Sequence, residues 1–122
     1  MATVSTAKQG DPIGSALFTL TETSTTASAV HMDGTSGSII MVEIDNTGNS
    51  VASYLNLYDA GAATVGTTDE EFVFMAPAST RITYACPEGA AYGTGLTGAI
   101  VSTPGSATGP SSTVTAYILV ST

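Results

Sequence analysis

Positively charged side chains are almost missing from this chain. Lys8 and Arg81 are the only Lys or Arg among 122 residues, against ten Asp and Glu, and the net charge at pH 7 is −8. Nucleic-acid binding requires clustered Lys and Arg that neutralise phosphates, and an anionic membrane surface attracts the same side chains. The composition therefore argues against nucleic acid and membranes as partners.

Cysteine and long apolar segments are also scarce. Cys86 is the single cysteine, so the chain can form neither an internal disulfide nor a cysteine-based metal site. The longest apolar run near the C-terminus covers residues 117–120, far fewer than the roughly 20 residues that span a bilayer. Residues 1–14 lack the apolar segment of a secretory signal. We therefore expect the protein to be made and folded in a reducing cytoplasm.

Residues that favour strands are abundant. Thr and Ser fill 35 of the 122 positions, and Val, Ile and Tyr are plentiful. Apolar residues recur with period 2: Leu55 and Leu57 share one face of a strand. Tyr54, Asn56 and Tyr58 share the other face. The same pattern predicts about eight strands, within residues 15–22, 25–33, 38–46, 51–59, 70–76, 80–86, 95–102 and 112–120.

The alternation also predicts which side chains enter the core. In residues 38–46, the period places Ile40 on the same face as Val42 and Ile44. It places Ile39 on the opposite face.

Short strands separated by turn formers predict an all-β protein, an antiparallel sandwich of about eight strands with a jelly-roll-like arrangement. Residues 87–89 are expected to form a turn, and the small residues of 102–112 an exposed loop. Residues 1–14 are polar and are interpreted as an N-terminal arm, and 15–122 as one sandwich domain. Ile13, at the end of this arm, is a candidate contact with a neighbouring molecule.

Motifs that could carry chemistry are weak. Residues 93–98 read GTGLTG, a literal GxGxxG, but a strand-like segment follows and no Asp or Glu occurs after Glu88. A glycine-rich bend where sheet backbones approach closely explains the motif better than dinucleotide binding. His31, the sole histidine, lacks a nucleophile motif, and Cys86 is interpreted as a small buried hydrophobe. We predict no catalytic residue and no cofactor.

The acidic residues 69–71 could join Asp59 or Asp45 in a cation site, because hard cations prefer several oxygens. No recognised ligand spacing is present, so a solvated loop is the preferred interpretation and no metal is predicted.

Two tyrosines are the candidate contact residues of the sandwich itself. Tyr54 and Tyr58 lie on one face of a strand with Asn56 between them. Tyrosine combines a large apolar ring with a polar tip and suits core or subunit-interface positions. A sugar-stacking platform is the alternative, which would make the protein a carbohydrate-binding module.

The segment from Val51 to Gly95 resembles a pattern in small structural proteins of tailed bacteriophages. It covers a little over a third of the chain. The matching residues are Leu55, Leu57, Tyr58, Asp59 and Ala60, then 64–68, Pro77 and Ala78, and finally Gly89, Tyr92, Thr94, Gly95 and Leu96.

This resemblance implies a non-enzymatic virion component, since such proteins look like β-sandwiches that decorate capsids or form tails and fibres, commonly as trimers. We therefore expect a capsid decoration (cement) protein, made in the host cytoplasm and bound to the outer capsid surface. Its partners would be the major capsid protein and other copies of itself in a homotrimer. A tail, fibre or neck component is the alternative within the same class.

Overall fold

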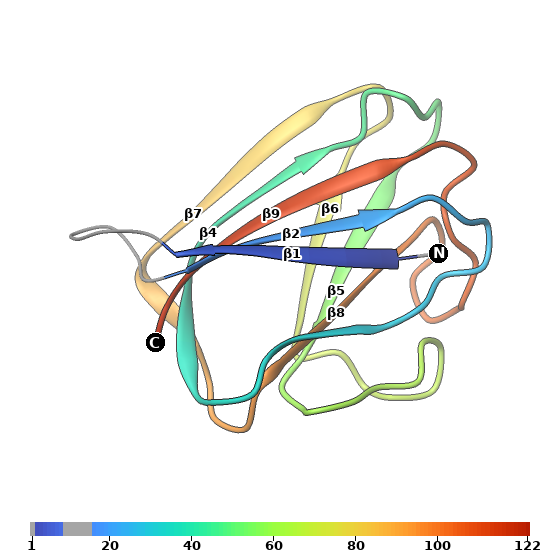
Figure 1. Cartoon of the computed structure of the whole chain (residues 1–122). Coiled ribbons are helices and arrows are strands. Elements are labelled where there is room, and N and C mark those ends of the chain that lie inside the picture. The colour runs from blue at the N-terminus through green and yellow to red at the C-terminus, as the bar shows by residue number, and fades with distance from the viewer. Residues whose placement is uncertain (1, 9–15) are drawn as a thin grey trace.

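The computed structural model describes residues 2–8 and 16–122, which form nine strands and no helix (Figure 1). The strands are β1 (Ala2–Lys8), β2 (Ala16–Glu22), β3 (Val30–Asp33), β4 (Gly37–Asp45), β5 (Ser53–Tyr58), β6 (Phe72–Ala76), β7 (Arg81–Tyr92), β8 (Leu96–Val101) and β9 (Val114–Ser121).

The strands make two antiparallel sheets, ordered β1-β2-β9-β4-β7 and β3-β8-β5-β6. Within them β2 pairs with β9, β3 with β8, β4 with β7 and β5 with β6. The chain is therefore one long antiparallel ribbon that turns back between β5 and β6 and is wound into two layers. This is the connectivity of a jelly roll. The all-β sandwich predicted from the sequence is confirmed, with β1 added at one edge.

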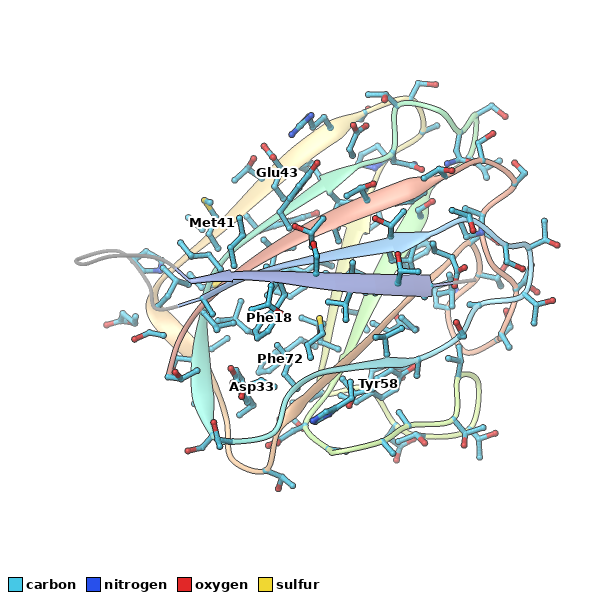
Figure 2. All side chains as sticks on the ribbon, viewed as in Figure 1. Phe18, Asp33, Met41, Glu43, Tyr58 and Phe72 are labelled. Carbon is cyan, nitrogen blue, oxygen red and sulfur yellow. The ribbon has the colours of Figure 1, made fainter. Side chains whose placement is uncertain are left out.

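One hydrophobic core fills the space between the sheets. Leu55 and Leu57 are fully buried there, as the period-2 pattern predicts. In Figure 2, Phe18 of β2 and Phe72 of β6 are labelled in this space, whereas Met41 and Glu43 lie on the side of β4 away from it. Strand β9 contributes four fully buried side chains: Val114, Ala116, Ile118 and Val120.

The N-terminal arm predicted for residues 1–14 needs correction where the structure describes it. Ala2–Lys8 form β1, which pairs along its whole length with β2. Ala2 is buried and Val4 packs against the core, so this segment belongs to the sandwich although its polar composition suggested otherwise. The register explains the composition, because Thr3 and Ser5 occupy the alternate, exposed face.

An irregularity in β4 and β7 changes which isoleucine enters the core. Between Ile39 and Met41 the register with β7 jumps, so that Ile40 stands opposite residues 86–89. Ile39 is therefore fully buried and Ile40 only partly so, the reverse of the predicted faces. The turn predicted at 87–89 is a bulge inside the long strand β7, and Gly89 in this bulge has a φ of 78°, a conformation that glycine adopts readily.

Neutral amides join the loops at one end of the sandwich. Asn46 Nδ2 donates to the carbonyl oxygens of Ala76 at 3.3 Å and Pro77 at 3.0 Å. Asn49 Nδ2 donates to Asn46 Oδ1 at 3.0 Å and to the carbonyl oxygen of Ser112 at 3.1 Å. Both asparagines are buried, and their hydrogen bonds hold three different loops together.

The loop 102–112 is fastened to the segment between β2 and β3. Gly109 N–H donates to the carbonyl of Thr25, and Ala27 N–H to the carbonyl of Ala107, both at 2.8 Å. This loop is exposed over most of its length, as predicted, but its backbone is ordered by these bonds.

A buried carboxylate orders the beginning of that same segment. Glu22 is fully buried, and its Oε2 accepts hydrogen bonds from the N–H groups of Thr23 and Ser24, while Oε1 accepts one from Ser28 N–H. The backbone donors take the place of water around the charge.

Candidate interaction surface

The two candidate tyrosines lie on one face of β5, as predicted, but in different surroundings. Tyr54 is half-buried, whereas Tyr58 is 1% exposed. The β5–β6 loop, residues 59–71, returns to this face, because Thr97 Oγ1 donates to the carbonyl of Ala60 at 2.7 Å. A sugar platform would need both rings open, and here only Tyr54 is accessible. Ile13 lies outside the described residues.

A buried polar group accompanies Tyr58 beneath this loop. Asn56 Nδ2 donates to Glu70 Oε1 at 3.3 Å, which fixes the loop to the strand. Asn56 Oδ1 and Tyr58 Oη are buried, and neither makes a well-formed hydrogen bond. Burial raises the pKa of Tyr58 above its ordinary value of 10.0, so the hydroxyl stays protonated at neutral pH.

The edge strand β6 is open on the same outer face. Val73 is 50% exposed and Met75 is 42% exposed, and the pairing places Met75 beside Tyr54 and Val73 beside Asn56. The only other large hydrophobic exposed in the described ranges is Val51, in the loop before β5. Val73 and Met75 were not among the predicted contact residues. The available signal was that residues 72–76 are apolar on both faces, which suits a central strand or an interface, whereas β6 is at an edge.

Acidic side chains border this open edge. Asp69 and Glu71 are exposed in the segment that enters β6, and Glu71 N–H donates to the carbonyl of Leu57 at 2.8 Å. Within residues 2–8 and 16–122, no group of three or more His, Cys, Asp or Glu side chains is arranged to hold a metal ion. The described part of the chain also contains no surface pocket.

Asp59, a candidate cation ligand, binds backbone amides instead. Its carboxylate accepts hydrogen bonds from the N–H groups of Gly93 at 2.9 Å, Thr94 at 2.8 Å and Gly95 at 3.3 Å. The bonds from Gly93 and Thr94 lower the pKa of Asp59. Asp59 thus fixes the β7–β8 turn to the end of β5.

Two glycines of the GxGxxG motif are closely packed, Gly95 against backbone and Gly98 against side chains of the core. A Cβ at Gly95 would lie 2.7 Å from the carbonyl oxygen of Asp33, and one at Gly98 would lie 2.7 Å from Met32 Cε and 3.1 Å from Leu20 Cδ2. These positions are inside a turn and a central strand, so the glycine-rich bend predicted from the sequence agrees with the structure.

His31 and Asp33 lie near this turn, at the end of β3, where Figure 2 labels Asp33. His31 is exposed and its Nδ1 is 3.4 Å from Thr97 Oγ1. Tyr92 Oη donates to Asp33 Oδ2 at 2.7 Å. Burial and the bond to Asp33 raise the pKa of Tyr92, and the pair ties β7 to β3 across the two sheets. Cys86, expected to be buried, is half-buried beside the β7 bulge.

The outer face of the five-stranded sheet carries a different set of side chains. The register aligns a row of apolar side chains, Leu17, Leu119, Met41 and Ala85, and two polar rows that cross β1, β2, β9, β4 and β7. The polar rows are Thr3, Thr21, Thr115, Asp45, Arg81 and Ser5, Thr19, Tyr117, Glu43, Thr83.

Arg81 pairs with the two acidic side chains of the polar rows, Glu43 and Asp45. Its Nη2 is 2.8 Å from Glu43 Oε1, its Nη1 is 3.5 Å from Asp45 Oδ2, and its Cζ is 5.6 Å from the centre of the Tyr117 ring. The hydrogen bond from Arg81 lowers the pKa of Glu43. The other cation of the chain, Lys8, lies in β1 at the far edge of the sheet.

Comparisons with known proteins add no relative. No family model, no curated protein and no solved structure matches the chain. The described residues include no helix long and apolar enough to cross a membrane.

Proposed function

We propose that this protein is a non-enzymatic structural component of a virus particle, most directly a decoration (cement) protein on the outside of a bacteriophage head. The observation that carries the proposal is the strand order: the eight strands β2–β9 follow a jelly-roll ribbon. Viral capsid domains and lectins use this architecture. Since one fold serves many functions, the resemblance of residues 51–95 to phage structural proteins is what favours a virion component over a lectin.

The surface chemistry supports an assembly role. Ser and Thr lose little side-chain entropy when they are packed against a neighbour, unlike Lys, Arg and Glu. The chain has 35 of the former and few of the latter, and its net charge of −8 keeps free subunits apart and soluble. On a shell, each bound copy would bury area across adjacent capsid subunits and so oppose their separation.

The proposed assembly on the shell is a homotrimer. Native mass spectrometry of the purified protein tests it, with an expected species of three times the 12.2 kDa chain mass. A strictly monomeric protein, both free and on particles, would contradict the trimer without contradicting a role in the virion.

The experiment that tests the function is the stoichiometry of this chain in purified phage particles, by quantitative mass spectrometry against the most abundant shell protein. A ratio near equimolar is expected for a decoration protein, because a shell offers many equivalent sites. A few copies per particle would identify a tail, fibre or neck component instead. Absence from the particles would overturn the proposal, and a glycan-binding screen with Tyr54→Ala would then test the carbohydrate-binding alternative.

A further inference from the structure

We propose that the outer side of β6 is the surface through which this protein binds the shell, and that the shell presents there an apolar centre bordered by Lys or Arg. The surface, called here the β6 patch, consists of Tyr54, Val73 and Met75 with Asp69 and Glu71 at its border. This inference rests on the proposed function and makes it more specific.

Apolar side chains are exposed on β6, at the edge of the four-stranded sheet. Val73 and Met75 are the outward residues of β6, and both are more than two-fifths exposed, while their inward neighbours Phe72 and Phe74 pack against the core. Proteins usually protect an edge strand with charged or proline residues, because an apolar edge invites association. Here residues 72–76 contain neither. Apolar side chains left exposed beside an unpaired edge indicate a docking surface.

The β6 patch is held in position by contacts within the fold. Tyr54 lies beside Met75 on one side and Val101 on the other, and Val101 is fully buried. The carbonyl oxygen of Met75 accepts a hydrogen bond from Tyr84 Oη of the facing sheet. The edge is therefore held in place without a partner, and little ordering entropy would be lost on binding.

Charge decides between a second copy and a different protein. Asp69 and Glu71 are exposed at the border, and a second copy docked by the same patch would bring four carboxylates together. The chain offers two cations to offset them, of which Arg81 is paired with Glu43 and Asp45 on the other sheet. Like charges across an interface oppose association, and a positive border on the partner favours it. The occupant is therefore a heterologous protein with a basic border.

The test uses phage heads purified from a strain that lacks this gene, mixed with the purified full chain. The main variant is Val73→Thr with Met75→Gln, which keeps side-chain size and strand propensity but removes the apolar character. The matched control is Met41→Gln, the same chemical change on the outer face of the other sheet. Circular dichroism and thermal melts of each variant verify that the sandwich is intact.

The expected result is a loss of affinity for the heads of roughly tenfold or more in the double variant, with Met41→Gln binding as the wild type. The border is tested by Asp69→Asn with Glu71→Gln, which should weaken binding and reduce its dependence on salt. Unchanged head binding by the double variant would overturn the β6 patch while leaving the decoration role intact. Failure of the wild-type protein to bind heads would overturn the proposed function itself.

Contact between two copies of the chain through the β6 patch would give a different result in these measurements. If the double variant lost its oligomeric state in native mass spectrometry but bound heads with unchanged affinity per chain, the β6 patch would be an interface between copies. That outcome would contradict the heterologous partner.

Discussion

The outer faces of the two sheets differ in their side chains and in how much of each face is exposed. On the five-stranded sheet, the outer face carries two rows rich in hydroxyl groups, the Arg81 cluster, and an apolar row through Leu17, Leu119 and Met41 that is half-buried or buried. The four-stranded sheet buries most of its outer face, where Asn56, Tyr58 and Thr97 are each 1% exposed. At its edge strand it instead exposes valine and methionine.

The difference shows where association is expected. A face whose charges are paired internally, as Arg81 is with Glu43, gains little from a partner, because binding must first remove water from those charges. A face that is covered in the centre and apolar at one edge presents a limited, preorganised contact area. The following experiments are designed to test this contrast, beginning with the largest expected effect.

Removing a tyrosine ring from each face should give unequal losses. Tyr58→Ala is expected to lower the free energy of unfolding by about 3 kcal/mol or more, since it opens a cavity below the β5–β6 loop. Tyr117→Ala, on the open face, should cost about 1 kcal/mol, because the ring is only half-buried and its surroundings are solvated. Urea denaturation of both variants measures the difference. Equal losses would show that the loop does not cover the four-stranded sheet in solution.

Removing only the hydroxyl group of a tyrosine tests its hydrogen bonding separately from the packing of its ring. Tyr92→Phe should cost about 1–2 kcal/mol, because it breaks the hydrogen bond to the Asp33 carboxylate. Tyr58→Phe should be neutral or stabilising by up to about 1 kcal/mol, because Tyr58 Oη makes no well-formed hydrogen bond. The order of the two variants in urea denaturation is the readout, and a reversed order would mean that a partner reaches the Tyr58 hydroxyl.

Tyr92 also predicts a loss of stability at alkaline pH. Its pKa is raised in the folded state above the ordinary 10.0, so its contribution is complete below pH 10 and is lost as the pH rises above that value. Thermal melts from pH 8 upward should show this loss in the wild type and a smaller one in Tyr92→Phe. A loss of the same size in both proteins would assign it to other groups.

Asp59, which holds the β7–β8 turn, predicts a loss of stability at acid pH. Its pKa is lowered in the folded state below 3.8, so its contribution is present above that value and disappears as the pH falls through the folded pKa. In Asp59→Asn this part of the acid sensitivity should be absent. The difference between wild-type and variant melts from pH 6 to pH 2 isolates it, since Glu43 and Asp45 titrate in both proteins. Identical pH profiles would contradict the role of Asp59 in holding the turn.

The smallest effect is expected on the open face. Arg81→Gln should let the pKa of Glu43 return upward toward its ordinary value of 4.5, because the hydrogen bond from Arg81 is lost. The free energy of unfolding should hardly change, since exposed ion pairs contribute little. A carboxyl NMR titration of Glu43 and a denaturation curve measure the two quantities. A large loss of stability would mean that the cluster supports the fold as well as the surface charge.

The sequence predicted the strands well because most of them carry a simple alternation. Leu55 and Leu57, for example, are buried as the period requires. The isoleucine pair at 39 and 40 was assigned to the wrong faces because β4 has a bulge there against both of its partner strands, β7 and β9. Periodicity within one segment contains no information about such a partner.

The candidate surface was harder to predict for a similar reason. Tyr54 and Tyr58 occupy equivalent positions in the alternation, but only Tyr58 lies beneath the β5–β6 loop. Val73 and Met75 look like core residues until the sheet order places β6 at an edge. Residues 2–8 look like an arm because half of an edge strand faces water. The missing information was the path of the covering loop for the two tyrosines, and the position of the strand in the sheet for β6 and β1.

The pairing of β2 with β9 has a consequence for how the protein is made. Ala16 pairs with Val120, so β2 cannot complete its pairing with β9 until residue 120 has left the ribosome. Such long-range closure is slow compared with local pairing, and β1 and β2 meanwhile expose strand edges. The five-stranded sheet can close only after β9 has been synthesised, so any assembly that uses the folded surface follows the synthesis of this strand.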